Sequence, residues 1–302
     1  MLNRQNIVVG LGELLWDLFP SGKQLGGAPA NFAYITTLLG DAGIPASRLG
    51  QDPLGAKALR RLTELGLSTE FIQKDADHPT GTVKVEVDRA GQPCFELSES
   101  VAWDFFDWTT KWQSLAQQAD VVCFGSLAQR AEASRNTIRR FLQGTRADAV
   151  RVFDVNLRQH FHSVEVIAES MRLASVVKLN HEELPRIMRM FAVENRSEEE
   201  SARHLLSAHN LKLVCVTRGT NGSLLVSSNE RNEHPGFKIK VADTVGAGDA
   251  FTAALVHGYL RKTPLAEMNE TANRIGAWVA SQPGGMPAPT SGSLGQDLEK
   301  IV

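Results

Sequence analysis

Short, continuously apolar runs recur along the chain and alternate with segments that have helical periodicity. The runs cover residues 7–11, 121–124, 150–155, 175–179 and 213–217. Between them, apolar residues have helical spacing, for example at 31–39, 54–65 and 134–142. Strands that are apolar on both faces are typical of a mostly parallel sheet with helices on either side. In such sheets ligands bind at the carboxyl ends of the strands, so we expect the functional residues there.

Residues 81–98 depart from this alternation of apolar runs and helical segments. Val83, Val85 and Val87 alternate with charged residues, and RAGQP at 89–93 turns the chain into a second short run. The pattern predicts a β-hairpin with one polar and one apolar face. We interpret it as a lid over the active site, through which two subunits would form a homodimer. The alternative is an edge hairpin packed on the main sheet.

The composition narrows the choice of partners and compartment. Of the 302 residues, 32 are Lys or Arg and 34 are Asp or Glu, which gives a net charge of −2. Because no long basic block is present, nucleic acid is not expected as a partner. The chain shows neither a signal-peptide pattern nor an apolar run long enough to span a membrane, so we expect a cytoplasmic protein without a membrane partner. Cys94, Cys123 and Cys215 lack pair spacing, which argues against a disulfide framework or a zinc site.

The sequence DTVGAGDAF at residues 243–251 is the strongest candidate for chemistry. Apolar residues with helical spacing follow it, so Gly246, Ala247 and Gly248 should form the first turn of a helix. Backbone N–H groups there lack intrahelical acceptors, and glycines let a phosphate approach them at the positive end of the helix dipole. Asp249 would stand beside that anion. The alternative is local: an acidic residue in a first turn also satisfies loose N–H groups.

A second polar cluster lies near the N-terminus. In the sequence GGAPAN at 26–31, paired glycines allow the backbone to approach a ligand, and Pro29 suits the first turn of a helix. Asn31 would project from that helix and, together with Asp17, could hold several hydroxyl groups. A simple turn and helix cap is the alternative.

Three further clusters end predicted strands in the second half of the chain. They are DVNLR at 154–158, KLNHEE at 178–183 and TRGTNG at 217–222. Carboxyl ends of parallel strands share one edge of a sheet, so these clusters should converge and favour a phosphate and cation site. Neither a Rossmann fingerprint nor a P-loop is complete, because Leu15 and Gln24 stand where these motifs need Gly and Ser or Thr.

Together these segments resemble the ribokinase-type sugar kinases of the pfkB carbohydrate kinase family, nearest to fructokinases. Five motifs carry the resemblance nearly end to end, at residues 12–17, 26–31, 180–183, 217–222 and 243–249. The resemblance implies a ribokinase-like three-layer α/β/α sandwich with a mostly parallel central sheet and a small β-sheet lid. It also implies a single kinase domain over residues 1–302, whose lid is formed by about 13–25 and 80–105.

The activity implied by the resemblance is ATP-dependent transfer of the γ-phosphoryl group to a sugar hydroxyl, with Mg²⁺ as cofactor. Carried over by position, Asp249 would be the base that faces the hydroxyl. The backbone of Gly246, Ala247 and Gly248 would stabilise the transferring phosphoryl group. A carboxylate made weakly basic by a helix N-terminus can suffice, because the transition state is loose and needs mostly positioning and charge stabilisation.

The remaining site residues follow from the same correspondence. The sugar would be held by Asp17, Gly27, Asn31, Phe95 and Arg158, with Phe95 closing a hydrophobic wall over the ring. The nucleotide would be bound by Asn180, Glu183, Thr217, Gly219, Gly222 and Asn273, the last near the adenine. Glu183 would also hold Mg²⁺ through its water. Asp243, the Val245 carbonyl and the loop at Gly285 resemble the K⁺ site of some members.

The choice of sugar rests on two motifs. Ribokinases usually place a Lys within the first glycine motif, whereas GGAPAN resembles fructokinases, as does DVNLR. Trp16 and Val155 depart from the usual fructokinase pattern. Fructose is therefore the first expectation, and ribose, a nucleoside or a sugar acid are alternatives within the family. A member that binds nucleotide without catalysis is the alternative of another class, against which the intact Asp249 and its glycines argue.

Overall fold

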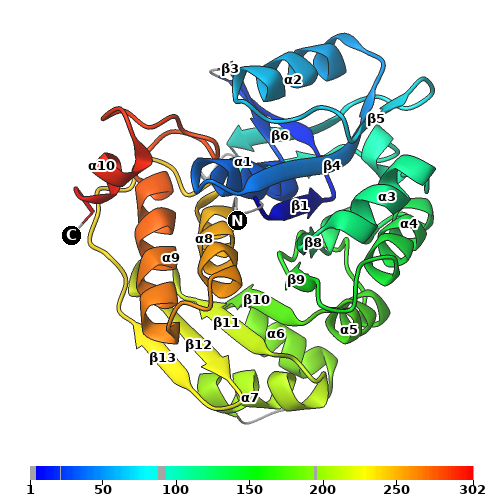
Figure 1. Ribbon diagram of the computed structural model, residues 1–302. Coiled ribbons are helices and arrows are strands. Elements are labelled where there is room, and N and C mark those ends of the chain that lie inside the picture. Colours follow the sequence, from blue (N-terminus) through cyan, green and yellow to red (C-terminus); the bar gives the residue numbers. More distant parts are fainter. Residues whose placement is uncertain (1–4, 21, 88–92, 194–195, 302) are drawn as a thin grey trace.

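A computed structural model describes residues 5–20, 22–87, 93–193 and 196–301, with the backbone alone at 85–87 and 93–95. Its main feature is a nine-stranded sheet in the order β13-β12-β11-β10-β9-β8-β1-β4-β5 (Figure 1). The strands are β1 (Ile7–Leu11), β4 (Ala42–Gly50), β5 (Ile72–Asp75), β8 (Val121–Gly125), β9 (Val150–Asp154), β10 (Val176–Asn180), β11 (Leu213–Thr217), β12 (Ser223–Ser227) and β13 (Arg231–His234). The pairings from β5 to β11 are parallel and only β12 and β13 add antiparallel ones, which confirms the mostly parallel sheet.

Helices cover both faces of this sheet, which gives the three expected layers (Figure 1). One face packs against α3 (Thr110–Gln118), α4 (Glu132–Gln143), α5 (Val164–Leu173), α6 (Glu183–Met190) and α7 (Glu198–Ala208). The other packs against α1 (Ala28–Leu38), α2 (Pro53–Glu64), α8 (Ala247–Leu260) and α9 (Leu265–Ala280), and the short α10 (Leu294–Leu298) contacts α9.

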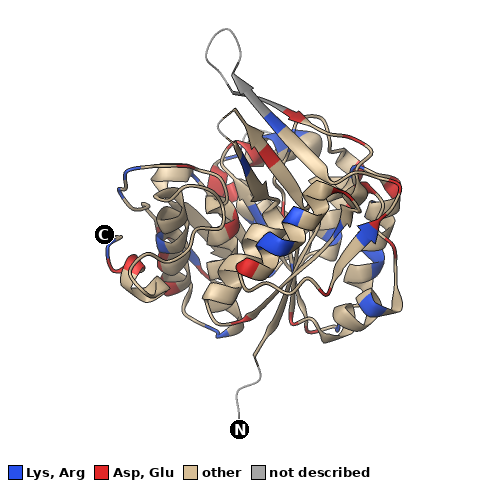
Figure 2. Cartoon of the chain, turned by 90° about the horizontal axis from the view of Figure 1, so that it is seen from above, with Lys and Arg blue, Asp and Glu red and all other residues tan. Residues whose placement is uncertain are grey.

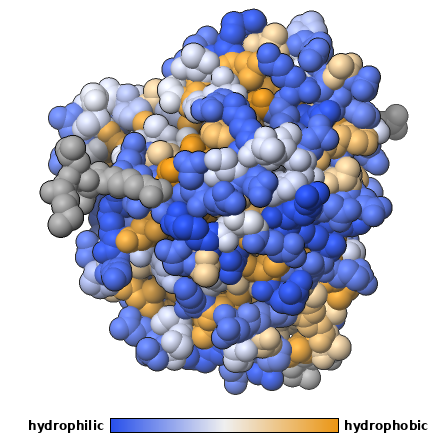
Figure 3. Space-filling view, turned by 45° about the vertical axis from the view of Figure 1, so that its right-hand side comes forward, coloured by the Kyte–Doolittle hydropathy of each residue, from blue (hydrophilic) through white to orange (hydrophobic). Residues whose placement is uncertain are grey.

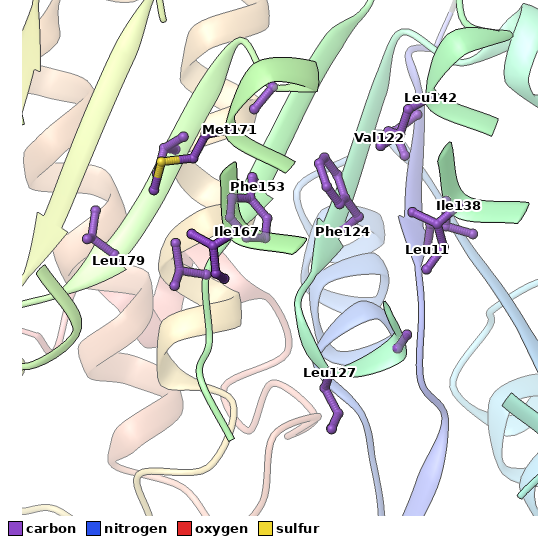
Figure 4. Close-up of a cluster of buried hydrophobic side chains, with 14 of the residues drawn as sticks. Leu11, Val122, Phe124, Leu127, Ile138, Leu142, Phe153, Ile167, Met171 and Leu179 are labelled. Atoms are coloured by element: carbon purple, nitrogen blue, oxygen red, sulfur yellow. The ribbon is translucent and has the colours of Figure 1, made fainter. Parts of the chain in front are cut away.

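The two layers of core follow directly from the period of two along each strand. Val122 and Phe124 of β8 point into the α3–α7 layer, whereas Val121 and Cys123 point into the α1–α9 layer. Figure 4 shows the first layer, where Phe124 and Phe153 lie beside each other with ring centroids 5.3 Å apart. This burial on both faces explains why the strands read as unbroken apolar runs.

A second sheet of four strands stands apart from the first, in the order β3-β2-β6-β7. It comprises β2 (Leu15–Phe19), β3 (Gly22–Gly26), β6 (Gly81–Val87) and β7 (Pro93–Leu97). The expected hairpin is present, since β6 and β7 pair antiparallel with Val83 opposite Leu97. Because β6 pairs with β2 and not with a strand of the central sheet, the alternative of an edge hairpin on the main sheet is wrong.

The surface mixes charges and polarities. Lys and Arg are interspersed with Asp and Glu along the described chain (Figure 2). On the face drawn in Figure 3, hydrophobic residues are scattered among hydrophilic ones. None of the helices in the described parts of the chain has the length and hydropathy needed to cross a lipid bilayer.

Candidate active site

The polar clusters meet where the strands of the central sheet end. Residues from the ends of β1, β8 and β9 line one small cavity together with the first turns of α1 and α8. Of the residues expected in the site, Asn31 and Asp249 come into direct contact, although 218 positions separate them in the chain. The parallel topology therefore gathers side chains that the sequence keeps far apart.

Helix α8 starts at a glycine because the backbone there admits no other residue without strain. Gly246 caps the helix with φ 76°, and a Cβ at this position would lie 2.4 Å from the Cα of Gly285. The N–H of Ala247 donates to the Thr244 carbonyl at 3.3 Å. Gly248 and Asp249 follow in the first turn, where helix geometry leaves N–H groups without an intrahelical acceptor. These two N–H groups, more than that of Ala247, can receive an anion.

Asp249 lies in that first turn and is held by a neighbouring helix. The Asn31 side chain of α1 donates a hydrogen bond from Nδ2 to Asp249 Oδ2 at 2.8 Å. Burial, with a smaller contribution from the charge of Asp154, raises the pKa of Asp249 to about 6, although the Asn31 hydrogen bond and the Lys178 charge oppose the shift. The expectation of a carboxylate made weakly basic by the helix N-terminus is therefore wrong. Its surroundings make Asp249 a stronger base than a free aspartate.

Beneath the first turn of α8 lies a buried ion pair whose two residues, Asp154 and Lys178, begin two of the predicted strand-end clusters but were given no role of their own. The Lys178 ammonium donates to both Asp154 oxygens at 3.1 and 3.0 Å. The Thr252 hydroxyl, which has one hydrogen to donate, lies within hydrogen-bond distance of Asp154 Oδ2 and of the Gly248 carbonyl, at 3.1 and 2.9 Å. A Cβ on Gly248 would lie 2.9 Å from Lys178 Nζ, so the cation lies directly against the glycine turn. A lysine inside an otherwise apolar strand was the available signal, since a buried charge needs a partner.

Burial disfavours the charged form of Lys178, but the neighbouring Asp154, Glu183 and Asp249 carboxylates outweigh it and raise its pKa. The ammonium therefore stays protonated at neutral pH. It places a permanent positive charge next to the backbone that would receive a phosphoryl group.

Asp17 projects from β2 of the small sheet. A Cβ on Gly26 would lie 2.4 Å from Asp17 Oδ2, so the carboxylate occupies the space that the glycine leaves free. Burial raises the pKa of Asp17 to about 6, and the charge of the exposed Arg158 opposes the shift. The Arg158 charge also opposes the rise in the pKa of Asp249, so it lies near enough to act on both carboxylates.

Gly27 joins the small sheet to α1. Its φ of 112° suits glycine, and a Cβ there would lie 2.4 Å from the Glu13 carbonyl oxygen. Phe95 belongs to β7, but its side chain lies outside the described residues, so its expected wall over the sugar stays a prediction. Gln24 of β3, which sequence reasoning left out of the site, reaches the loop at Gly284, where a Cβ would lie 3.0 Å from its Oε1. The small sheet therefore borders the site through Asp17 and Gln24.

Glu183 is buried at the end of β10. Its two oxygens accept hydrogen bonds from the Leu157 and Asn180 backbone N–H groups, each at 2.8 Å. Asn180 in turn caps the same turn, because its Oδ1 accepts from the N–H groups of Glu182 and Glu183. Glu183 thus ties the end of β9 to the end of β10. Each oxygen keeps a second lone pair with which to hold the water of a metal ion.

The loop at Asp243 and the loop at Gly285 are joined to each other. Asp243 accepts hydrogen bonds from the N–H groups of Val245 at 3.0 Å and Gly284 at 3.1 Å. Within the described residues, no group of three or more His, Cys, Asp or Glu side chains is arranged to hold a metal. Mg²⁺ itself usually keeps several waters and binds through one or two carboxylates together with phosphates of a substrate, so it does not require such a group of side chains.

The expected nucleotide residues lie further along the same edge. Thr217 ends β11, and Gly219 and Gly222 have φ values of 58° and 77° in the turn before β12, where Gly219 is exposed and Gly222 is buried. Asn273 of α9 is buried, and its Nδ2 donates to Ser223 Oγ at 2.8 Å and to the Asn269 carbonyl at 2.8 Å. The side-chain amide of Asn273 therefore joins α9 to β12.

Together these groups can remove a proton next to an anion site. Asp249 could act as the base, and the N–H groups at the start of α8 with Lys178 behind them could supply positive charge. Phosphoryl transfer to a hydroxyl requires a base near the hydroxyl and hydrogen-bond donors near the transferring phosphoryl group, held in a fixed arrangement.

Comparisons with known proteins identify the family of this chain. The model of the pfkB family carbohydrate kinases matches residues 20–291. A fructokinase of Vibrio alginolyticus is 30% identical, with 94% of this chain and 96% of the relative covered. The structure of a sugar kinase of Pyrococcus horikoshii in complex with ATP is 27% identical and superposes with a TM-score of 0.81, over 98% of this chain and 100% of the other.

A third comparison concerns a fructokinase double mutant from Vibrio cholerae with fructose, ADP and potassium ion bound. It is 26% identical, with a TM-score of 0.78 over 94% of each chain. These similarities extend over nearly the whole of this chain and include both sheets. The chain belongs to the pfkB family of carbohydrate kinases, which are phosphotransferases that act on a hydroxyl group.

Proposed function

We propose that this kinase transfers the γ-phosphoryl group of ATP to a hydroxyl group of fructose. The observation that carries the proposal is the pair of Asn31 and Asp249 at the start of α8, where a base with a raised pKa stands beside free backbone donors. Asp249 removes the hydroxyl proton as the oxygen attacks phosphorus. The donors and the Lys178 charge stabilise the phosphoryl group.

Asp17 and Asn31 would hold the sugar hydroxyls, with Gly27 giving the close approach and Arg158 adding positive charge. The choice of fructose is supported by the fructokinase relative at 30% identity and by the related structure that holds fructose. Ribose, a nucleoside and a sugar acid are the competing substrates. Each of these substrates would have to bind to the same Asp17 carboxylate and Asn31 amide.

ATP and a divalent cation fit the described residues. A related structure contains ATP. In this chain Thr217, Gly219 and Gly222 form the turn that would receive the phosphates, and Glu183 keeps lone pairs for the water of Mg²⁺. The metal would screen the charge of the phosphates when bound.

We further propose that residues 1–302 form one kinase domain and that the small sheet acts as its lid. Asp17 and Gln24 on this sheet face the site, which supports the lid role. A homodimer formed through the lid and a cytoplasmic location stay predictions.

The substrate is tested by ADP release from ATP and Mg²⁺ with a panel of fructose, ribose, a nucleoside and a sugar acid. We expect fructose to give the highest kcat/KM, because the GGAPAN and DVNLR motifs, which contain expected sugar-binding residues, resemble those of fructokinases. A higher value for another substrate would replace fructose by that substrate. If none of them stimulates turnover while ATP still binds, the protein is a noncatalytic nucleotide-binding member.

The K⁺ site is tested by replacing K⁺ with Na⁺ or with tetramethylammonium in the same assay. We expect turnover to fall about tenfold. The loops at Asp243 and at Gly285 would lose the cation that orders the start of α8. Asp243→Asn should give the same low rate in K⁺ and in Na⁺. Equal rates of the unaltered protein in all three cations would exclude a monovalent-cation role.

A further inference from the structure

Glu13 is a buried carboxyl group that the proposed reaction does not use. It lies between β1 and the first strand of the small sheet, which begins at Leu15, and only 4% of its surface is exposed. Its Oε2 is buried without a hydrogen-bond partner among the described residues. Leaving a buried polar atom unpaired is costly, so a residue in this position calls for an explanation.

A small cavity connects Glu13 with Asp249. About 10 Å³ of it is open to the centre of a water molecule, and Glu13, Asp154, Asn156, Asp249 and Thr252 supply its polar lining. This volume is at the lower limit for one buried water molecule, which needs two to four polar partners. The lining contains several polar residues, and Glu13, whose Oε2 is unpaired, is one of them. Water-mediated contact between the two carboxyl groups is therefore sterically and chemically feasible.

We propose that Glu13 is a second proton-holding residue, which receives through one water molecule in this cavity the proton that Asp249 takes from the sugar. The inference rests on the proposed function. In the transfer step the sugar O–H bond breaks and Asp249 gains the proton. The new bond from the sugar oxygen to the γ-phosphorus forms as the bond from that phosphorus to the bridging oxygen of ATP breaks, and ADP leaves with the electron pair of the broken bond. Asp249 then passes its proton to the water, and the water passes one of its own to the Glu13 carboxylate. Glu13 acts through Asp249 and does not contact the sugar.

The surroundings of Glu13 suit this role. Burial, with a smaller contribution from the Asp249 charge, raises the pKa of Glu13 to about 7, although backbone N–H groups and the Arg158 charge oppose the shift. Lys178 and Asp154 complete the charged groups around the cavity, and the Cys123 thiol on its wall has a raised pKa because it is buried. Two coupled acids near pH 6 and 7 titrate as a pair, and a proton moves between them at little cost.

The test is the pH dependence of kcat/KM for the unaltered protein and for Glu13→Gln, which keeps the size of the side chain. The unaltered protein should lose activity in two protonation steps as the pH falls through 7 and 6, because each carboxylate must be free to accept a proton. Glu13→Gln should show only the lower step and, above pH 7, a kcat about tenfold lower with little change in KM. Glu132→Gln on the surface of α4 is the matched control and should behave as the unaltered protein.

A role for Glu13 in packing alone would lower the rate of Glu13→Gln equally at every pH and leave both steps in place, which would overturn the proposal. An infrared titration needs no turnover, so it tests the role of Glu13 even if the proposed kinase activity is absent. The infrared signal of protonated carboxyl groups should contain a component that titrates near pH 7 in the unaltered protein and is missing in Glu13→Gln, whereas the components near pH 6 from Asp17 and Asp249 remain. In Asp249→Asn the Glu13 component should titrate at a lower pH, because the repelling charge is gone. An unchanged midpoint in Asp249→Asn would show that the two groups are uncoupled.

Discussion

Asp249→Asn should lower kcat by about 10³-fold, because an amide cannot take the proton of the sugar hydroxyl. ATP binding should persist, since the backbone donors at the start of α8 do not depend on the carboxylate. Stopped turnover with retained ATP binding, measured by ADP release and by calorimetry, is the expected result. Asp148→Asn is a suitable control, because Asp148 is an exposed partner of Arg146.

The pH dependence gives Asp249→Asn a second readout. Asp249 acts as a base only when deprotonated, and its pKa is about 6, so activity of the unaltered protein should rise as the pH rises through 6. That step should be missing from the residual activity of Asp249→Asn. A variant that keeps more than a tenth of the turnover would show that another group removes the proton.

Lys178→Met should destabilise the protein by about 3–5 kcal/mol, because it leaves the Asp154 carboxylate buried without its counter-charge. The variant should also lose activity, since the cation behind Gly248 is removed. Urea unfolding monitored by circular dichroism measures the stability. Lys111→Met, at an exposed ion pair with Glu70, is the matched control and should change stability little.

The double variant Lys178→Met with Asp154→Leu separates the two roles of this ion pair. Replacing both partners by apolar residues of similar size removes the uncompensated charge, so most of the stability should return. Activity should stay low, because the positive charge beside the glycine turn is still missing. If the double variant regains both stability and activity, Lys178 contributes to stability alone and not to catalysis. If it is as unstable as the single variant, the uncompensated Asp154 charge is not the cause of the lost stability.

Much of the fold could be predicted from the sequence. The apolar runs at 121–124 and 213–217 correspond to β8 and β11, and the helical spacing at 54–65 corresponds to α2. These patterns are readable because the side chains of a strand or helix repeat with a fixed period and the two faces of the sheet are both buried. The hairpin at 81–98 was also readable, but its pairing with β2 was not, since pairing partners are distant in the chain.

The sequence by itself determined the architecture, the glycine turn at the start of α8 and the family, because periodicity and glycine positions are local properties of the chain. Only the tertiary structure decided how basic Asp249 is, and it reversed the expected direction. It alone placed Lys178 against Gly248 and Glu13 on a cavity shared with Asp249. The physical reason is that a pKa depends on burial and on neighbouring charges, and here those neighbours come from strands and helices far apart in the sequence.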